Sequence, residues 1–529
     1  MRIVNCNGEA YVLRKAIRWP VVFSMLLMLL LNACATRHIS KEPLPKTKSY
    51  AMAASRDGQL AILADNISAK FGRDSSAFLL IDHNDEALRW RLMLADLAAQ
   101  SIDVQYFLWY DDAVGNLFAK RIYQAAERGV RIRILVDDIL MLDDDEDIAT
   151  LSLHPNIDIS IFNPWLGRDT TVGRGFEFLN SMDRLNKRMH NKLMVADNQV
   201  AIVGGRNIGD EYFGFNRRYN FRDMDVIAIG SIAVDVSRAF DLYWNDDWAY
   251  RGEAFATKKT TADRLPGMIK KFDKKLAKYQ ELLAPIGIEP QTWAKHLMLL
   301  ENEASPGRAW VFYDDPPASV KGPQVRLVQK IDDLNVETQK EILIANAYFI
   351  PDEKMVEKIR FWTAAGVRVR ILTNSLASND VAIVNSGYKL WRRPVIEAGA
   401  ELYELRHDAK DRILSEDPRL KPEFLSLHSK VIAVDRKTSL VGSLNLDPRA
   451  LKIHTEMGIV IEDPVLGERL AQIIERDMGP DNAWRVKIDD KGKLYWESSA
   501  GVVYRQPVKS FWQRIEDAFF SLLPIKDQL

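Results

Sequence analysis

The chain has 529 residues, of which 47% are hydrophobic and 27% charged, a composition typical of a folded protein with two or three domains. Its formal net charge is −1, so no overall positive field favours a polyanion such as DNA, which argues against a nuclease without excluding one. The only cysteines, Cys6 and Cys34, are too few for a disulfide framework or a cysteine-based metal site.

Residues 1–34 have the pattern of a targeting segment. A basic region precedes an apolar run over 21–31, which is too short to span a bilayer comfortably. The run ends in Leu-Asn-Ala-Cys, which resembles a bacterial lipobox with Cys34 as the lipidated first residue of the mature protein. An uncleaved signal anchor is the alternative. Ala35 rather than Asp follows the cysteine, and by resemblance to the sorting of Gram-negative lipoproteins this implies a lipid anchor in the outer membrane and a body in the periplasm.

The rest of the chain divides by composition and by an internal repeat. Residues 35–75 are polar and are expected to form a tether. The two copies of the repeat are 76–250 and 306–480. The lysine-rich stretch 251–305 predicts a solvated helical connector rather than a contact with anionic lipids. Residues 481–529 predict a hairpin and then an amphipathic helix that packs on the body rather than lying in a membrane.

Both copies have their elements in the same order. A strand-like segment, 102–109 or 342–350, is followed by a helical stretch and then by an alternating apolar and basic run, 129–135 or 366–372. Each run begins with glycine, which is typical of a helix end that leads into a strand with one buried face. The repeat therefore predicts an α/β fold of two similar domains packed about a pseudo-twofold axis.

Each copy also carries the pattern H-x-K-x4-D-x6-G-[GS]-x-N. One match could be chance, but two matches at equivalent points of a repeat are strong evidence for a shared site. The residues of the two patterns are His190, Lys192, Asp197 and Asn207 in the first copy, and His428, Lys430, Asp435 and Asn445 in the second.

The spacing within the pattern suits chemistry on a phosphate. Histidine and lysine two residues apart on a strand point to the same face, so both can address one phosphate group. The lysines, with Asn207 and Asn445, would stabilise charge on the phosphoryl oxygens. With the two half-sites face to face, one histidine would attack phosphorus and the other would protonate the departing oxygen, which gives a phosphohistidine intermediate. This scheme needs no metal or other cofactor, and the acidic run 143–147 lacks the EF-hand pattern.

The carboxylates that would orient the imidazoles are a separate question. Asp197 and Asp435 complete the motif and are counted with its catalytic residues. They follow strands at turns, however, where aspartate commonly bonds local backbone, so they are poor candidates for orienting a histidine. Asp223 and Glu456 occupy equivalent positions just before a strand in the two copies. We therefore predict that Asp223 and Glu456 fix the tautomers of the catalytic histidines.

The doubled motif resembles the HKD motif of the phospholipase D superfamily. The resemblance implies two domains, each a mixed β-sheet flanked by helices, with the active site at their interface. It also implies His190 as the nucleophile and His428 as the general acid. From about residue 76 to the end the chain resembles bacterial cardiolipin synthases of the C type, on segments such as SIDVQYFLWYDD, NKRMHNKLMVAD and GSLNLDPRALKIHTEMG.

This resemblance implies transfer of a phosphatidyl group onto phosphatidylglycerol to give cardiolipin, with phosphatidylethanolamine as a second candidate donor. Two departures leave the acceptor preference open: Asn385 stands where such synthases often carry histidine, and His454 stands where asparagine is usual. The alternatives are a hydrolytic phospholipase D, then a nuclease or other phosphodiesterase, and a non-catalytic lipid-binding lipoprotein. The last would allow decay of one motif, yet both are intact. Since one chain carries both half-sites, we expect a monomer that binds phospholipids and no nucleic acid.

Overall fold

A computed structural model describes residues 47–72, 75–140, 145–168, 171–257, 260–320, 324–333 and 337–520. The predicted signal segment, Cys34, the first part of the tether and the segment after residue 520 lie outside the described residues. By its internal contacts the chain divides into a small unit, whose described part lies in 165–182, and a large unit that contains both copies of the repeat. None of the helices in the described ranges has both the length and the apolar composition needed to cross a membrane.

The first copy forms a mixed sheet in the order β9-β4-β3-β2-β5-β6-β8-β1. The neighbours β4, β3 and β2 are parallel, and the remaining pairs are antiparallel. The strands are β1 (Ser76–Ile81), β2 (Ser101–Tyr106), β3 (Arg131–Asp137), β4 (Ile157–Phe162), β5 (Leu193–Ala196), β6 (Val200–Gly204), β8 (Asp225–Gly230) and β9 (Ala249–Arg251).

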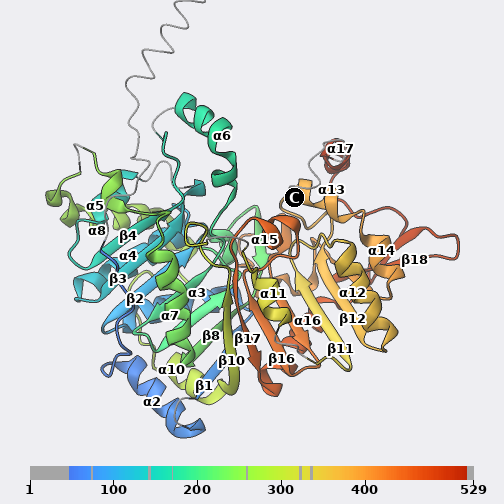
Figure 1. The fold of residues 1–529 in the computed structure, drawn as a ribbon, viewed down its shortest axis with the longest axis horizontal. Helices are drawn as coiled ribbons and strands as arrows, with labels where there is room; N and C mark the ends of the chain where they lie inside the picture. The colour runs from blue at the N-terminus through green and yellow to red at the C-terminus, as the bar shows by residue number, and fades with distance from the viewer. Residues whose placement is uncertain are drawn as a thin grey trace, which may run out of the picture. The chain divides into compact units, whose positions relative to one another are not determined.

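The second copy repeats this order as β18-β13-β12-β11-β15-β16-β17-β10, and β19 and β20 extend it beyond β18. The first strands of the two copies, β1 and β10, pair antiparallel, so both halves share one 18-stranded sheet (Figure 1). The strands are β10 (Ser305–Tyr313), β11 (Glu341–Asn346), β12 (Arg368–Asn374), β13 (Glu401–Leu405), β15 (Lys430–Val434), β16 (Thr438–Gly442), β17 (Met457–Glu462), β18 (Ala483–Ile488), β19 (Leu494–Ser498) and β20 (Gly501–Val503).

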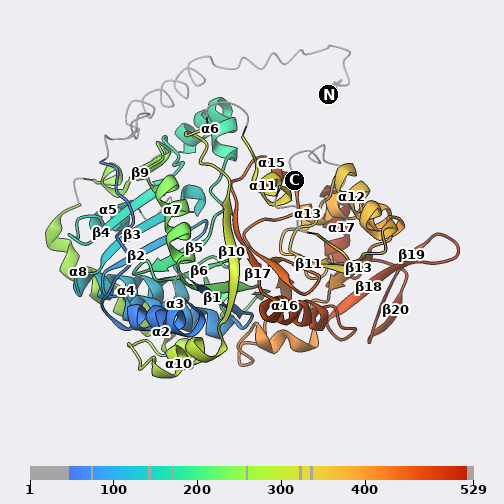
Figure 2. The same cartoon turned by 60° about the horizontal axis from the view of Figure 1, so that its bottom comes forward.

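Helices flank this sheet, and Figure 2 shows α3 and α4 side by side against the first half. The helices other than short 3-10 turns are α2 (Gln59–Phe71), α3 (Asn84–Leu97), α4 (Ala113–Glu127), α5 (Asp145–Leu151), α6 (Thr171–Asn186), α7 (Ile232–Trp244), α8 (Leu265–Leu276), α9 (Gln280–Leu283), α10 (Ala294–Glu303), α11 (Leu327–Asp332), α12 (Glu353–Ala364), α13 (Ala382–Tyr388), α14 (Arg392–Glu397), α15 (Pro448–Lys452), α16 (Pro464–Asp477) and α17 (Phe511–Phe520).

The equivalent helices α4 and α12 each begin at an aspartate cap and are each followed by a glycine. Asp112 caps α4 and Asp352 caps α12, each accepting a hydrogen bond from a backbone N–H three residues later at 2.9 Å. Gly129 and Gly366 follow the two helices with φ of 94° and 86°, a conformation that favours glycine, and the chain then enters β3 or β12. The glycine-led runs thus end one helix and start the next strand, as the sequence predicts.

One hydrophobic core runs through both halves. It contains Phe240 and Trp244 of α7 together with Leu470 and Ile474 of α16, packed on alternate residues of strands from both copies. Burial of this shared apolar surface favours the two halves as a single body. The prediction of an α/β protein with two similar domains, each a mixed sheet flanked by helices, is confirmed.

Helix α17 packs differently from the expectation. Its buried side chains are Gln513 and Asp517, while apolar side chains remain exposed. Gln513 donates to the Leu376 carbonyl at 2.6 Å, and Asp517 accepts from Asn385 and Lys389 at 2.7 and 2.8 Å. The polar face therefore holds α17 to the body, and the prediction that its apolar stripe does so is wrong. The exposed side chains are Phe511, Trp512, Ile515 and Phe519.

The motif aspartates hold the starts of two strands. Asp197 and Asp435 lie in equivalent turns with φ of 55° and 50°, which aspartate tolerates better than most residues. Asp197 accepts hydrogen bonds of 2.7–3.1 Å from the N–H groups of 99–101, at the start of β2. Asp435 accepts three of 2.8 Å from 339–341, at the start of β11. Burial raises the pKa of Asp435, but these amides outweigh it and lower the pKa overall.

We predict that Asp197→Asn mainly lowers stability, because an amide NH₂ would face backbone N–H donors. The expected loss is about 1–3 kcal/mol in the free energy of unfolding, measured by thermal or denaturant unfolding, with near-normal turnover by the folded variant. Asp435→Asn is the matched control and should cost less, because Asp435 is less buried than Asp197. A large loss of turnover at unchanged stability would contradict this assignment.

Candidate active site

Each motif histidine is carried by a segment that is hydrogen-bonded to the other half. His190 donates its backbone N–H to the Thr455 carbonyl at 2.9 Å, and the Thr455 N–H returns to the Arg188 carbonyl at 2.9 Å. In the equivalent place β7 (Tyr219–Arg222) pairs parallel with β14 (Phe424–Leu427), and the His428 N–H donates to the carbonyl of Arg222 at 2.8 Å. The backbone thus brings the two histidine segments to the interface between the copies.

The residues that follow these contacts are the two predicted orienting carboxylates. Nδ1 of His190 lies 3.0 Å from both carboxylate oxygens of Glu456, and Nδ1 of His428 lies 2.6 Å from Oδ2 of Asp223. Both carboxylates are fully buried, and the histidines are 7% and 6% exposed. Each imidazole is therefore oriented by the carboxylate of the other half, with its Nε2 left for chemistry.

The motif lysines lie beside their own histidines. Nζ of Lys192 donates to the His190 carbonyl at 2.6 Å, while Nζ of Lys430 donates to the His428 carbonyl and lies 3.0 Å from its Nδ1. Both lysines are almost completely buried. Two lysine amino groups thus lie beside the two imidazoles, a combination of side chains suited to a phosphate group.

Burial and these cations set the protonation of the site. Burial, with the charge of Lys430 next, lowers the pKa of His428 to about 4, and burial with Lys192 holds the pKa of His190 well below its usual value. Without a bound phosphate, both imidazoles are therefore neutral near pH 7, and a neutral imidazole is the nucleophilic form. Burial also lowers the pKa of Lys430 to about 8, so its ammonium is close to titration at physiological pH.

The motif asparagines differ in their surroundings. Asn207 donates from Nδ2 to the hydroxyl of Tyr212 at 2.9 Å and accepts from the N–H of Leu108 at 3.2 Å. Asn445 is 6% exposed, and its buried Oδ1 has no hydrogen-bond partner among the described residues. The Asn207 donor is thus engaged by a hydroxyl that a phosphate would have to displace or share.

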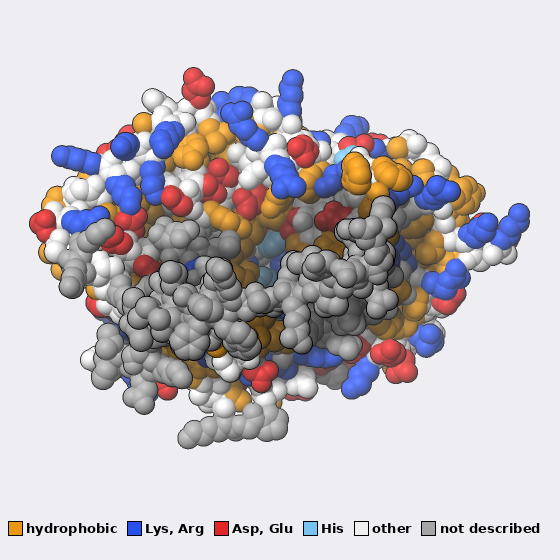
Figure 3. Space-filling view, turned by 90° about the horizontal axis from the view of Figure 1, so that it is seen from above, with side chains coloured by type: hydrophobic (Ala, Val, Ile, Leu, Met, Phe, Trp, Pro, Cys, Tyr) orange, Lys and Arg blue, Asp and Glu red, His pale blue; other side chains and the backbone are white. Residues whose placement is uncertain are grey.

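Aromatic rings that the motif does not mark pack on the histidines. The ring of Phe107 lies 4.9 Å from that of His190, and the rings of Tyr212 and Phe221 lie 5.2 and 4.6 Å from that of His428. The strand register places Ala347 at the point equivalent to Phe107, so the repeat gives no signal for this residue. Figure 3 shows histidine side chains set back in the middle of one face.

Three positions that the sequence analysis names have their contacts elsewhere. Asp197 and Asp435 bond the backbone at the starts of β2 and β11, and their place in the catalytic set stays a prediction. Asn385 donates to Asp517 on α17. Within the described ranges, no group of three His, Cys, Asp or Glu side chains could hold a metal ion.

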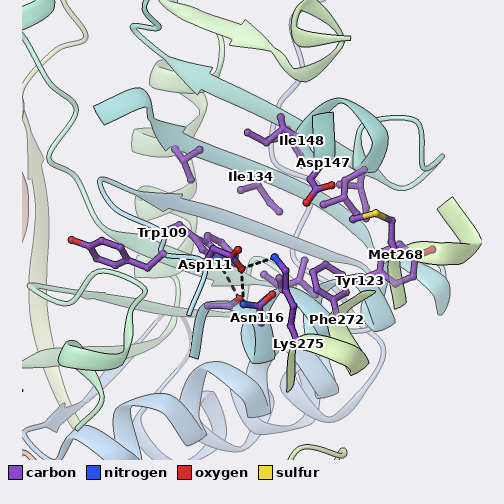
Figure 4. A pocket seen from close by; sticks show the side chains of 18 residues that line it. Trp109, Asp111, Asn116, Tyr123, Ile134, Asp147, Ile148, Met268, Phe272 and Lys275 are labelled. Atoms are coloured by element: carbon purple, nitrogen blue, oxygen red, sulfur yellow. Dashed lines mark hydrogen bonds and ion pairs between the residues drawn. The ribbon is translucent and has the colours of Figure 1, made fainter. Parts of the chain in front are cut away.

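A separate cavity of about 120 Å³ lies in the first half (Figure 4). Its walls are mostly apolar, with side chains from the sheet and from helices α4, α5 and α8, such as Ile134, Ile148 and Phe272. Lys275 and Asp111 form an ion pair of 2.6 Å at this cavity. Neither motif histidine lines it, and its composition suits an apolar group rather than a phosphate.

Comparisons with known proteins agree with this architecture. Residues 93–244 and 331–478 match the family model described as cardiolipin synthase, PLD-like domain. The chain is 34% identical over 463 residues to cardiolipin synthase C of Escherichia coli K12, covering 83% of this chain and 93% of that protein. It is 31% identical over 454 residues to an uncharacterized protein of Helicobacter pylori 26695, covering 84% of this chain and 83% of that protein.

The fold also resembles a solved structure. The crystal structure of phosphatidylserine synthase from Haemophilus influenzae Rd KW20 matches 89% of this chain and 100% of its own with a TM-score of 0.55. The sequence identity is 17%, so this similarity concerns the fold alone.

We predict that Asp223→Asn lowers kcat by about 10²–10⁴-fold, because an amide cannot hold the imidazole of His428 in the correct tautomer or stabilise its charge. Steady-state kinetics on a phospholipid substrate, with thermal unfolding to confirm folding, measures this effect. Glu456→Gln is the matched variant for His190 and should behave alike. Near-normal rates in both variants would remove the orienting role.

The pKa of Lys430 predicts the alkaline limb of the pH profile. Below about pH 8 the ammonium is charged and stabilises a bound phosphate, so we expect kcat/KM to fall as the pH rises through about 8. Lys430→Arg keeps its charge at higher pH and should move this limb upward even if the maximal rate is lower. An alkaline limb that is identical in both proteins would contradict the assignment to Lys430.

Proposed function

The chain belongs to the phospholipase D superfamily and is a cardiolipin synthase-like enzyme, and on this basis we propose that it transfers a phosphatidyl group onto phosphatidylglycerol to form cardiolipin. The observation that carries the proposal is the pair of buried histidines, each held at Nδ1 by a carboxylate of the other half. Two imidazoles, one from each half, suit a displacement at phosphorus in two steps.

In the first step Nε2 of His190 attacks the phosphorus of the donor lipid. The bond from phosphorus to the head-group oxygen breaks. His428, which enters this step as an imidazolium stabilised by Asp223 and by the negative charge of the lipid phosphate, gives that oxygen its Nε2 proton. A phosphatidyl group is left on His190. In the second step a hydroxyl of phosphatidylglycerol attacks the same phosphorus and passes its proton to His428, while the bond to His190 breaks. Lys192 and Lys430 stabilise the negative charge on the phosphoryl oxygens in both steps.

The two carboxylates support the proposed division of roles between the histidines. Burial raises the pKa of Asp223, but the neighbouring His428 and Lys430 outweigh it and lower the pKa overall. Burial raises the pKa of Glu456, and this effect prevails. An ionised carboxylate at Nδ1 stabilises an imidazolium, so Asp223 supports His428 as the acid and base. His190, beside the less readily ionised Glu456, is left as the nucleophile.

Two features support a lipid substrate at a membrane surface. Helix α17 exposes Phe511, Trp512 and Phe519 by 72%, 75% and 59%, an apolar face typical of contact with lipid. The apolar cavity of the first half also suits hydrocarbon. We propose that the protein acts on envelope phospholipids as a monomer. Lipidation at Cys34 and an outer-membrane, periplasm-facing location complete this proposal. Phosphatidylethanolamine is the second candidate donor.

The test is a lipid assay with the full-length protein in mixed micelles. We expect cardiolipin from phosphatidylglycerol, with phosphatidylethanolamine added in a parallel reaction to identify the donor. His190→Ala and His428→Ala should each lower turnover by more than about 10³-fold, because each removes one of the two groups that share the displacement. Only His190→Ala should also prevent trapping of a phosphoryl-enzyme.

The products separate the alternatives. Phosphatidic acid without cardiolipin would make the protein a hydrolytic phospholipase D. A near-normal rate in either histidine variant would exclude the two-histidine mechanism. No reaction with any phospholipid would turn attention to nucleic acids and other phosphodiesters.

A further inference from the structure

A third histidine lies beside the nucleophile. His454 belongs to the segment between α15 and β17, and its ring lies 6.0 Å from that of His190 and 6.5 Å from that of Phe107. Nη2 of Arg449, on α15, lies 3.2 Å from Nε2 of His454. All of these side chains except His190 are partly exposed, so they line the wall next to the reaction centre. The two-step mechanism above uses neither His454 nor Arg449.

The hydrogen bond from Arg449 fixes the tautomer of His454. A guanidinium can only donate, so Nε2 of His454 must accept, and the proton of a neutral ring is then on Nδ1. Burial, with the charges of Arg449 and Arg188 next, lowers the pKa of His454 to about 3, so the ring is neutral near pH 7. The pair thus offers a guanidinium and an imidazole N–H, both donors suited to an anion.

The other charges around this pair are accounted for by contacts within the protein. Arg188 donates to Asp137 at 3.3 Å and to the Asn163 carbonyl, and Arg326 lies 3.2 Å from Asp314. Asp447, the nearby carboxyl group, caps α15 by accepting from the Ala450 N–H at 2.9 Å. Arg449 therefore adds a guanidinium to the wall beside His190, and the carboxylate of Asp447 acts on its charge.

We propose that Arg449 and His454 form a second anion subsite, which binds the phosphate of the acceptor lipid. This inference rests on the proposed function and names what selects its acceptor. In phosphatidylglycerol the attacking hydroxyl and the lipid's own phosphate lie on one glycerol. When the hydroxyl reaches the phosphorus on His190, the second phosphate must therefore lie one glycerol length away. The wall formed by His454 and Arg449 is adjacent to His190 at this scale.

Such a subsite explains how transfer can prevail over hydrolysis. Water and simple alcohols carry no phosphate, so they gain nothing from Arg449, whereas a phospholipid acceptor gains a charge-assisted hydrogen bond and is held in position for attack. Histidine at 454 keeps a donor N–H toward the anion while its other nitrogen holds the guanidinium in place.

The experiment compares two acceptors with one donor. Full-length protein is given labelled phosphatidylethanolamine with either phosphatidylglycerol or free glycerol, and initial rates of cardiolipin or phosphatidylglycerol formation are measured. We expect Arg449→Gln to lower transfer to phosphatidylglycerol by roughly 10–100-fold relative to transfer to glycerol. Arg449→Lys, which keeps the charge, should lose less, and His454→Ala should shift the ratio in the same direction as Arg449→Gln.

The outcomes distinguish this inference from the proposed function. Equal losses with both acceptors would overturn the subsite and make Arg449 a positioning residue for His190. Unchanged rates with both acceptors would also overturn it. Wild-type protein that makes no cardiolipin, while still releasing the head group of the donor, would overturn the proposed function and the subsite with it. Thermal unfolding of each variant, with Arg449→Lys as the conservative replacement, separates these results from misfolding.

Discussion

The structure depends on one interaction made twice: a histidine of one half held by a carboxylate of the other. His190 with Glu456 and His428 with Asp223 are both buried, and a buried imidazole needs such a partner to fix its tautomer. Neither half contains a complete pair. The two halves must therefore keep their relative position to within the distance range that a hydrogen bond tolerates.

The rest of the fold holds the two halves in this relative position. Pairing of β1 with β10 makes one sheet of both copies, and helices α7 and α16 share a core that crosses the junction. The backbone of each histidine is hydrogen-bonded to the residue just before the partner carboxylate, His190 to Thr455 and His428 to Arg222. These bonds fix the position of each histidine relative to its carboxylate. Side chains held this way by packing and by backbone bonds lose little freedom on binding substrate, which favours catalysis.

Much of this organisation could be predicted from the sequence because it is repeated. The glycine-led runs, the His-Lys spacing and the equivalence of Asp223 and Glu456 each occur twice, and repetition distinguishes a signal from chance. The exchange of carboxylates between halves could not be predicted, because spacing along a chain says nothing of which copy a side chain faces. Phe107 was missed for a related reason: its counterpart is Ala347, so the repeat does not mark it. For α17 the apolar stripe suggested the wrong face, since buried polar bonds of Gln513 and Asp517 decide its packing.

The unlike carboxylates have a further consequence. Two identical copies assembled as a symmetric pair would have identical imidazoles, and neither could be committed to attack or to proton transfer before substrate arrived. Joining the copies in one chain frees each to change alone. The carboxylate is aspartate at 2.6 Å on one side and glutamate at 3.0 Å on the other, and a tyrosine lies against the ring of His428. Two identical chains could not carry these differences. Covalent linkage of the two copies thus allows two equivalent histidines to have different surroundings and different roles.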